Sequence, residues 1–319
     1  MPPRIGISIG DPNGIGPEIT LKAIASLPEL PLIPIGDRTL LSRSARELNL
    51  PLPAEIFDPG PAFPDPRPGE ISAAAGAASA AWVQAGIQAC LQGQLDALVT
   101  ALVSKEAWQR AGIGYPGHTE LLADACGTSR FGMLLAGAGL RVMLATRHVP
   151  LRHVPDALTP DTIRTAAELL VEGLPALGIP QPRIAICGLN PHAGDGGAIG
   201  DEELTWIGPL IRRLAAEGLP VSGPHPADTV FHQAVREQAF DAVIALYHDQ
   251  GLGPLKLWAF DEGVNLTLGL PIVRTSPDHG TAFGIAGRNL ARPHSMTAAI
   301  RTAAQLASTP RPASWMPVK

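Results

Sequence analysis

Cysteine is scarce in this sequence, and the few residues that occur form no recognisable framework. Cys90, Cys126 and Cys187 each lie in an apolar run, and their spacing matches neither a zinc motif nor a disulfide pattern. Small buried thiols explain all three. A chain without disulfides is typical of a reducing compartment, so we expect a cytoplasmic protein.

Long apolar runs and an excess of basic residues are also missing. No run approaches the roughly 20 apolar residues that span a bilayer. Met1–Gly10 lacks the basic and then apolar order of a signal peptide. The net charge of −5 differs from the basic balance of most nucleic-acid binders. We therefore expect neither a membrane nor a nucleic acid among the partners.

The remaining composition is that of a globular protein, with 45% hydrophobic and 17% charged residues in 319, enough for two lobes. Short apolar runs alternate with longer helical patterns, which predicts an α/β fold. The proline-rich residues 51–68 indicate an irregular excursion between regular elements. The predicted strands are Arg4–Ile9, Pro31–Ile35, Ala97–Leu102, Gly132–Leu135, Leu140–Ala145, Arg183–Cys187, Ala242–Tyr247 and Val264–Leu268. The predicted helices are Pro17–Ser26, Arg38–Leu48, Ser72–Leu91, Pro160–Leu177, Asp201–Glu217 and Ser295–Leu306.

Three histidines follow the carboxyl ends of predicted strands. His148, His192 and His248 come after the apolar runs that end near Ala145, Leu189 and Tyr247. Ligands of open α/β sheets bind beyond these strand ends. Three imidazoles there favour one divalent metal with an open coordination position, although each is also compatible with an ordinary loop or capping histidine.

Two glycine-rich segments suit close approach of a ligand to the backbone. Gly10–Glu18 joins the first strand to the first helix, but it lacks the G-x-G-x-x-G spacing of the Rossmann fingerprint. A tight turn explains it equally well. Asn190–Gly197 is the stronger of the two, because it also presents His192 after a strand.

A candidate phosphate cluster comes from separate parts of the chain. His118 and Thr119 precede a helical run, whose first turn offers free N–H groups to an anion. Lys256, Asn265 and Arg274 follow at intervals of nine residues. Their side chains suit one phosphate, while singly each also suits a solvated surface.

Several ordered blocks resemble the 4-hydroxythreonine-4-phosphate dehydrogenase family, from Gly10 to about Arg288. The longest block is GVNLTLGLPIVRTSPDHGTA, Gly263–Ala282. The others are GDPNGIGPE (Gly10–Glu18), GHTE (Gly117–Glu120), TRHVP (Thr146–Pro150), CGLNPHAG (Cys187–Gly194), PADT (Pro226–Thr229) and YHDQGL (Tyr247–Leu252).

The resemblance implies a two-lobed fold like that of isocitrate and isopropylmalate dehydrogenases, with central sheets flanked by helices. Residues 1–120 and 265–319 are then the dinucleotide-binding lobe, and residues 121–264 the lobe for metal, substrate and dimerisation. It also implies that the adenosine of NAD or NADP lies on a loop without a Rossmann fingerprint. The residues of that loop are His279, Gly280, Thr281, Ala282 and Gly287.

By the same resemblance, His148, His192 and His248 bind one divalent ion per site, which is zinc, magnesium or cobalt. The substrate-binding residues are His118, Thr119, Lys256, Asn265 and Arg274. The family forms homodimers with shared active sites, and we expect His248 to face His148 and His192 from the opposite subunit.

One departure from the family pattern concerns the segment Thr100–Lys105. The family has proline where this sequence has Leu102, which leaves the local turn and the exact substrate open. Relatives oxidise four-carbon phosphorylated sugar acids or aromatic dihydrodiols, so these substrates remain alternatives.

The implied reaction is oxidation of 4-phosphohydroxy-L-threonine at its secondary alcohol, followed by decarboxylation to 3-amino-2-oxopropyl phosphate. Asp228, Asp249 and Lys105 are candidates for the general base, although a carboxylate beside a metal histidine equally suits a supporting role. Two other classes stay open. A phosphate acyltransferase needs no histidine triad, and a metal-dependent lyase or hydrolase needs no adenosine loop.

Overall fold

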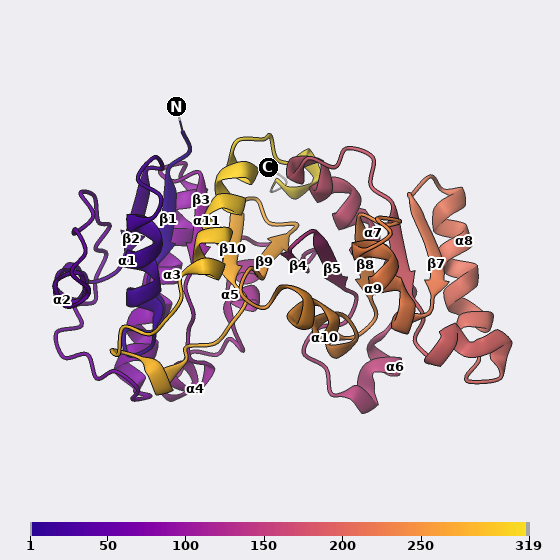
Figure 1. Cartoon of the computed structure of the whole chain (residues 1–319), viewed down its shortest axis with the longest axis horizontal. Helices are drawn as coiled ribbons and strands as arrows, with labels where there is room; N and C mark the ends of the chain where they lie inside the picture. Colours follow the sequence, from indigo (N-terminus) through magenta and orange to yellow (C-terminus); the bar gives the residue numbers. More distant parts are fainter. Residues whose placement is uncertain (1, 317–319) are drawn as a thin grey trace. The chain divides into compact units, whose positions relative to one another are not determined.

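The α/β fold expected from the sequence is confirmed, and it is divided between two units. The computed structural model describes residues 2–316 (Figure 1). Unit 1 comprises Met1–Ser129 and Leu270–Lys319, and unit 2 comprises Arg130–Gly269. The chain enters unit 2 after Ser129 and returns to unit 1 after Gly269, so both boundaries lie later in the chain than the expected ones, which followed residues 120 and 264. The reason is that helix α5 (His118–Ala125) stays whole in unit 1 and strand β9 (Val264–Leu268) stays whole in unit 2.

The sheet of unit 1 consists of four parallel strands in the order β2-β1-β3-β10. They are β1 (Ile5–Ser8), β2 (Leu32–Ile35), β3 (Ala97–Thr100) and β10 (Val273–Pro277). Every residue of these strands is buried. Burial on both faces explains why β1, β2 and β3 read as short continuous apolar runs.

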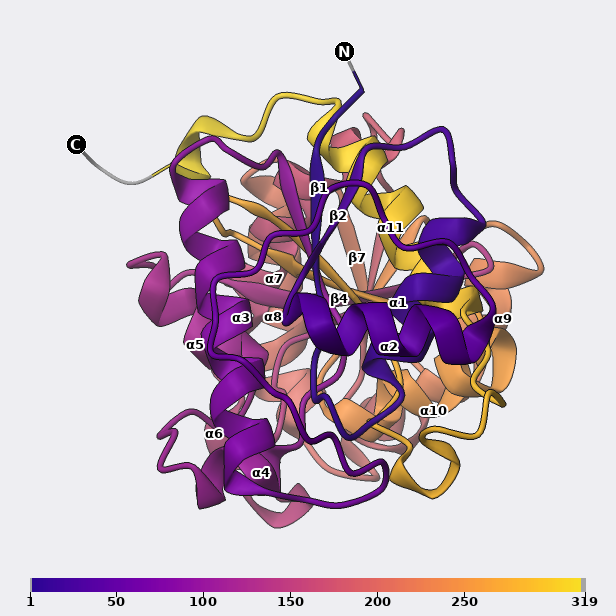
Figure 2. The ribbon, with the colours of Figure 1, turned by 90° about the vertical axis from the view of Figure 1, so that its left-hand side faces the viewer.

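Helices cover both faces of this sheet. They are α1 (Gly16–Ala25), α2 (Arg38–Leu48), α3 (Ala73–Leu91), α4 (Lys105–Arg110), α5 and α11 (His294–Ala307). In Figure 2, α3 lies to one side of β1 and β2, while α1 and α11 lie to the other. Short polar side chains start three of these helices. Asp37, Ser72 and Ser104 accept the N–H group of the residue three positions later and so cap α2, α3 and α4.

The sheet of unit 2 is mixed, in the order β9-β4-β5-β8-β6-β7. Strand β4 (Gly132–Gly137) runs antiparallel to both β9 and β5 (Leu140–Leu144). Strands β5, β8 (Ala242–Ala245), β6 (Ile184–Cys187) and β7 (Val221–His225) are parallel. The carboxyl ends of β5, β8 and β6 therefore lie side by side at one edge, which positions the loops described below.

The helices of unit 2 are α6 (Val154–Ala157), α7 (Pro160–Gly173), α8 (Gly208–Ala216), α9 (Ala227–Val235) and α10 (His248–Ala259). Helix α7 packs on β4, β5, β8 and β9, and α9 and α10 also pack on β5 and β8. Thr159 and Thr162 form a reciprocal capping box at the start of α7. No helix within residues 2–316 has both the length and the apolar character needed to cross a membrane.

Strands β7 and β10 and helices α4, α6, α9 and α10 were not among the elements predicted from the sequence. Strand β10 has the sequence VRTSP, which is buried but is not an apolar run. Its polar groups form hydrogen bonds inside the protein. Thr275, for example, donates its hydroxyl to the Ala299 carbonyl at 2.8 Å. Helix α10 contains two glycines and Pro254, residues that ordinarily indicate a loop.

The three cysteines are free thiols. Cys126 and Cys187 are buried as expected, whereas Cys90 is half-buried. Burial raises the pKa of Cys90 and of Cys187 to about 12 and that of Cys126 to about 11. The thiols therefore stay protonated and unreactive at neutral pH.

Candidate functional site

Arg274 places a buried positive charge in the sheet of unit 1. Only 3% of its surface is exposed, and its guanidinium donates two hydrogen bonds, at 2.6 and 3.2 Å, to the Thr100 hydroxyl on the neighbouring strand β3. Burial lowers the pKa of Arg274 to about 9, and the negative charge of Glu120 acts in the opposite direction. The side chain stays cationic at neutral pH, so an anion beside it would be stabilised in a region of low dielectric.

His118 adds a shielded polar atom to the same region. It is the first residue of α5, and its Nε2 is buried without a hydrogen-bond partner. Its ring meets Trp108 edge to face, with centroids 5.6 Å apart. Burial, followed by the charges of Arg274 and Lys105, holds the pKa of His118 well below its usual range. The ring is therefore neutral, and its orphaned Nε2 is available to a ligand.

The start of α5 completes an anion-binding arrangement. Gly117 supplies no side-chain cap, so the first N–H groups of α5 have no capping side chain. Thr119, the second helical residue, is 5% exposed. A helix N-terminus, a buried guanidinium and an unpartnered imidazole nitrogen together suit a phosphate group.

The Gly10–Glu18 turn lies against the expected adenosine loop. A side chain at Gly10 would put its Cβ 2.3 Å from the Leu102 carbonyl oxygen, so this turn requires glycine. The Ile15 amide donates to the Thr281 carbonyl at 3.0 Å, and Gly14 also approaches Thr281. A hollow of unit 1 borders the turn and reaches Gly287. Its lining consists of Pro12, Gly14, Pro17, Glu18, Leu40, Arg43, Ser44, Glu47, Leu48, Pro66, Pro68, Gly287 and Asn289.

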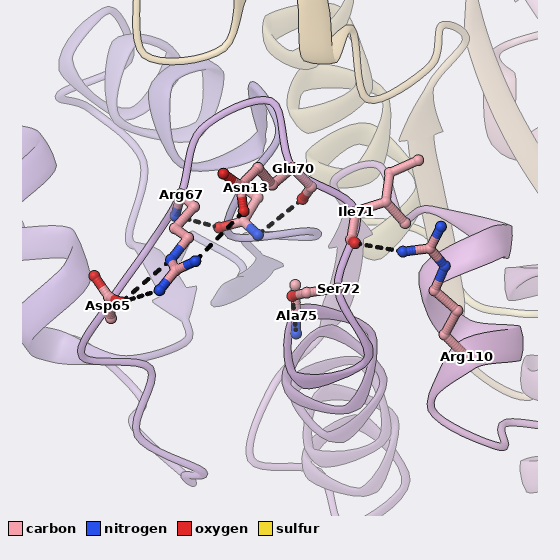
Figure 3. A network of polar contacts seen from close by, with 8 residues as sticks. All are labelled: Asn13, Asp65, Arg67, Glu70, Ile71, Ser72, Ala75 and Arg110. Atoms are coloured by element: carbon pink, nitrogen blue, oxygen red, sulfur yellow. Dashed lines mark hydrogen bonds and ion pairs between the residues drawn. The ribbon is translucent and has the colours of Figure 1, made fainter.

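Asn13 fixes the proline-rich excursion to this turn (Figure 3). The side-chain amide of Asn13 donates a hydrogen bond to the Glu70 backbone carbonyl at 2.9 Å and accepts one from the Arg67 backbone amide at 2.7 Å. The backbone carbonyl of Asn13 accepts a hydrogen bond from the Gly69 amide at 2.8 Å. The excursion, expected only to be irregular, therefore forms one wall of the hollow through Pro66 and Pro68.

Asp11 in the same turn is fully buried and gives a pH-dependent prediction. Burial raises the pKa of Asp11 to about 6, although the Asn13 amide donates to its Oδ1; its Oδ2 has no partner. Folding therefore favours the protonated form, and this contribution to stability is lost as pH rises from the ordinary aspartate pKa of 3.8 through the raised pKa of about 6. The shift corresponds to roughly 3 kcal/mol.

We expect the unfolding free energy of wild type, minus that of Asp11→Asn, to fall by roughly 2–3 kcal/mol between about pH 4 and about pH 7. The amide does not titrate, so the difference isolates the carboxyl group. Urea unfolding of both proteins at a series of pH values measures it. A difference that is constant over this range would show that Asp11 does not titrate as described.

In unit 2, two of the three expected metal histidines come together. The rings of His148 and His248 have centroids 5.6 Å apart. His248 opens α10, and its Nδ1 lies 2.7 Å from Asp249 Oδ1, which leaves Nε2 available. His192 lies on a different loop, with its Nδ1 3.6 Å from Asp228 Oδ2. Within residues 2–316, no three His, Cys, Asp or Glu side chains gather closely enough to hold a metal.

The expected division of the ligands, with His148 and His192 in one subunit and His248 in the other, stays a prediction. Within one chain the rings of His148 and His248 are neighbours. The reason is the sheet order, because β5 and β8 are neighbours and their carboxyl ends carry these two residues.

Lys256 and Asn265, also expected to bind the substrate, belong to unit 2, whereas Arg274 belongs to unit 1. Lys256 lies on α10 with its Nζ 5.8 Å from the Phe260 ring centroid. Asn265 lies on β9, and its Oδ1 is buried without a hydrogen-bond partner. The unpartnered amide oxygen suits a ligand that donates a hydrogen bond.

Comparison with known proteins assigns the family. The model of the family described as "Pyridoxal phosphate biosynthetic protein PdxA" matches residues 16–303. The chain belongs to the PdxA family. A relative from Ruegeria sp. (strain TM1040), named 4-hydroxythreonine-4-phosphate dehydrogenase, is 46% identical over 98% of this chain and 99% of its own.

Solved structures of similar proteins have the same fold as this PdxA-family chain. A 4-hydroxythreonine-4-phosphate dehydrogenase from Klebsiella pneumoniae is 40% identical, with a TM-score of 0.86 and coverage of 97% of this chain and 99% of that one. A terephthalate 1,2-cis-dihydrodiol dehydrogenase from Burkholderia xenovorans LB400 is 35% identical, with a TM-score of 0.67 and coverage of 95% and 98%.

Leu102, the position at which we expected the family to have proline, lies in a turn that is hydrogen-bonded to the Gly10–Glu18 segment. Its carbonyl accepts the Asp11 amide at 2.8 Å, and its side chain is buried with 8% exposed. Ser104 then caps α4, so that Lys105 is the first helical residue. The loop thus keeps Thr100 beside Arg274 and Lys105 near His118.

Sequence reasoning missed Gln250, which ties together two loops of this PdxA-family site. Its Oε1 accepts the Leu246 amide and its Nε2 donates to the Gly188 carbonyl, both at 2.7 Å. It therefore links the ends of β8 and β6, from which His248 and His192 follow. Its place two residues after His248 is the only signal in the sequence.

Proposed function

We propose that this chain oxidises 4-phosphohydroxy-L-threonine with NAD+ or NADP+ and that the product loses CO2, giving 3-amino-2-oxopropyl phosphate for pyridoxal 5′-phosphate biosynthesis. The observation that carries the proposal is the shielded anion-binding arrangement of Arg274, His118 and the start of α5. The names of its relatives support the same reaction.

The chemistry balances in two steps. The carbon bearing the secondary hydroxyl gives a hydride to the nicotinamide, and the hydroxyl proton passes to a base. The resulting β-keto acid breaks its bond to the carboxylate, CO2 leaves, and the electron pair left on the α-carbon takes up a proton. A bound divalent ion supplies Lewis acidity for these oxygen atoms, and the dinucleotide supplies the hydride acceptor.

Arg274 and His118 are proposed to hold the substrate phosphate. The buried guanidinium supplies the charge, and the orphaned His118 Nε2 supplies a hydrogen bond. Thr119 contributes its backbone and hydroxyl at the start of α5. Lys256 and Asn265 are proposed to recognise the remaining polar groups of the substrate.

The histidines fit a divalent metal. Imidazole nitrogens bind zinc at about 2.0–2.1 Å, which sets the ring centroids of two ligands roughly 5 Å apart. The 5.6 Å between the rings of His148 and His248 agrees with this geometry. We propose that His148, His192 and His248 hold one zinc, magnesium or cobalt ion, with ligands from both subunits of a dimer.

The dinucleotide is proposed to bind along the loop from His279 to Gly287 in unit 1. Thr281 and Gly14 bring that loop and the glycine-rich turn together, and Gly287 borders the adjacent hollow. Gly280 and Ala282 add little side-chain bulk, and the exposed Gly280 leaves its backbone accessible. These features fit a flat nucleoside approaching the backbone, with either NAD or NADP.

Two of the three candidates for the general base lie beside histidines. Asp249 is bonded to His248, and Asp228 lies 3.6 Å from His192. Both positions favour an orienting role toward a metal ligand. Lys105 instead lies near His118 in the anion-binding region, and we propose it as the first candidate for the base.

A homodimer is proposed because, within residues 2–316 of one chain, no three metal-ligating side chains gather closely enough to hold an ion. Unit 2 also exposes large apolar side chains that suit burial against a second copy. Leu257, Phe260 and Leu151 are 90%, 64% and 71% exposed. Leu257 lies on α10, the helix that His248 begins, and Phe260 directly follows this helix.

Mixing inactive variants tests the sharing. His192→Ala and His248→Ala are each expected to be inactive. After dissociation and reassociation, about half the dimers are hybrids, and in each hybrid one site carries both lesions while the other is intact. Activity should recover to about a quarter of wild type.

The matched control is a mixture of His148→Ala and His248→Ala. If these two residues act in one chain, every hybrid site keeps one lesion and no activity returns. Recovery of activity in this control would place His148 and His248 in opposite subunits, as expected from the sequence. Verified hybrids without activity in either mixture would contradict a shared site.

A second candidate is oxidation of an aromatic cis-dihydrodiol, favoured by the similarity to the Burkholderia xenovorans enzyme. Nicotinamide absorbance should be recorded with 4-phosphohydroxy-L-threonine, a four-carbon phosphorylated sugar acid and terephthalate dihydrodiol. We expect the first to give the highest kcat/KM. A higher kcat/KM with either of the other two substrates would mean that the proposed substrate is wrong. Acyl transfer or bond cleavage without dinucleotide reduction would mean that the proposed enzyme class is wrong.

A further inference from the structure

The loop that carries His192 has an unusual backbone. His192, Ala193 and Asp195 have φ angles of 53°, 53° and 44°, and Gly194 and Gly196 between and after them are also positive. Consecutive left-handed residues are unfavourable for L-amino acids other than glycine. Such a run persists only where neighbouring groups hold it in place.

Glu203 provides such a group. Only 6% of this residue is exposed. Its Oε1 accepts the backbone amides of Leu189 and Asn190, both at 2.7 Å, and its Oε2 accepts the Asn190 side-chain amide at 2.9 Å. One carboxylate therefore fixes the chain immediately before the left-handed run.

The glycines of the loop make room for this carboxylate. A Cβ at Gly194 would lie 2.9 Å from Glu203 Oε2, and one at Gly188 would lie 3.1 Å from Oε1. The loop thus wraps around the Glu203 side chain on both sides of His192.

Glu203 also begins a π-helical turn, Glu203–Ile207, ahead of α8. Single π-turns are rare and frequently mark functional sites. We infer that Glu203 is a positioning residue: its carboxylate holds the Leu189–Gly197 loop so that the His192 ring is presented for metal binding. The inference rests on the proposed role of His192 as a metal ligand.

Cobalt titration tests it, with Co2+ added to metal-free dimer and followed by its visible absorption. Residues that orient a metal ligand typically contribute 10–100-fold to affinity, so Glu203→Ala should weaken Co2+ binding by roughly that factor. Glu203→Gln keeps one acceptor oxygen and should lose less. The control is Glu202→Gln, because Glu202 contacts the Asn190 side chain but neither of the two backbone amides.

Hydrogen exchange supplies a readout that does not depend on metal. The amides of Leu189 and Asn190 should exchange faster in both Glu203 variants, while those of β6 should keep the wild-type rate. The kcat should fall with Co2+ affinity, and the KM for the dinucleotide should not change. If Glu203→Ala fails to fold, Glu203→Gln decides by the same measurements.

His192→Ala separates the two levels of the argument. If it binds Co2+ as tightly as wild type, the proposed ligand set and the positioning role are both overturned. If it binds Co2+ weakly while both Glu203 variants match wild type in Co2+ affinity and kcat, only the positioning role of Glu203 is overturned, even where the loop amides exchange faster.

Discussion

Alanine at His248 is expected to lower kcat/KM by at least about 10³-fold while the protein stays folded. The estimate follows from the several kcal/mol that a catalytic metal contributes to the transition state. The ring centroid of His248 lies 5.6 Å from that of His148. Alanine at His248 therefore removes one of two neighbouring imidazoles that are proposed to bind the metal. Steady-state kinetics with saturating divalent metal and circular dichroism measure the two parts of this expectation.

His232→Ala is the matched control, because His232 is an exposed histidine on α9 of the same unit, paired only loosely with Glu237 at 3.7 Å. It should retain wild-type activity. Exhaustive chelation of wild type should reproduce the His248→Ala defect, and adding back a divalent ion should reverse it. Full turnover by protein shown by elemental analysis to be metal-free would refute the metal site.

Replacing Arg274 with methionine should reduce kcat/KM for the phosphorylated substrate by about 10- to 150-fold. A hydrogen bond to a charged group contributes roughly 1.5–3 kcal/mol, and the loss appears in kcat/KM. Burial strengthens this interaction, because 3% exposure leaves little solvent to screen the charge. Methionine keeps much of the side-chain volume without the guanidinium.

The substrate without its phosphate identifies what Arg274 recognises. Wild type should use it poorly, and Arg274→Met should reduce its kcat/KM far less than that of the phosphorylated substrate. Arg46→Met, on the exposed face of α2, controls for loss of a charge in the same unit. Equal losses on both substrates would mean that Arg274 serves the fold and not the phosphate.

The sequence predicted the α/β class because most strands are buried on both faces and therefore read as apolar runs. Strand β10 shows where this argument ends. Its Arg274 and Thr275 are buried through hydrogen bonds to Thr100 and to the Ala299 carbonyl, and such partners come from distant parts of the chain. Hydrophobic periodicity carries no information about them.

The candidate site shows the same limit in its loops. The position of His148 and His248 after strands indicated that they would lie together, and the pairing of β5 with β8 accounts for it. His192 also follows a strand, β6, but the left-handed backbone around it depends on a contact with Glu203. That contact cannot be predicted from the spacing of the histidines in the sequence.

The most direct measurement is the stoichiometry of the reaction with 4-phosphohydroxy-L-threonine. Metal-loaded protein should produce one CO2 for each NADH or NADPH formed, and metal-stripped protein should produce neither. Nicotinamide absorbance and trapped CO2 can be followed in the same sample. Equal amounts of the two products that appear only with metal agree with the account; dinucleotide reduction without CO2, or CO2 without dinucleotide reduction, contradicts it.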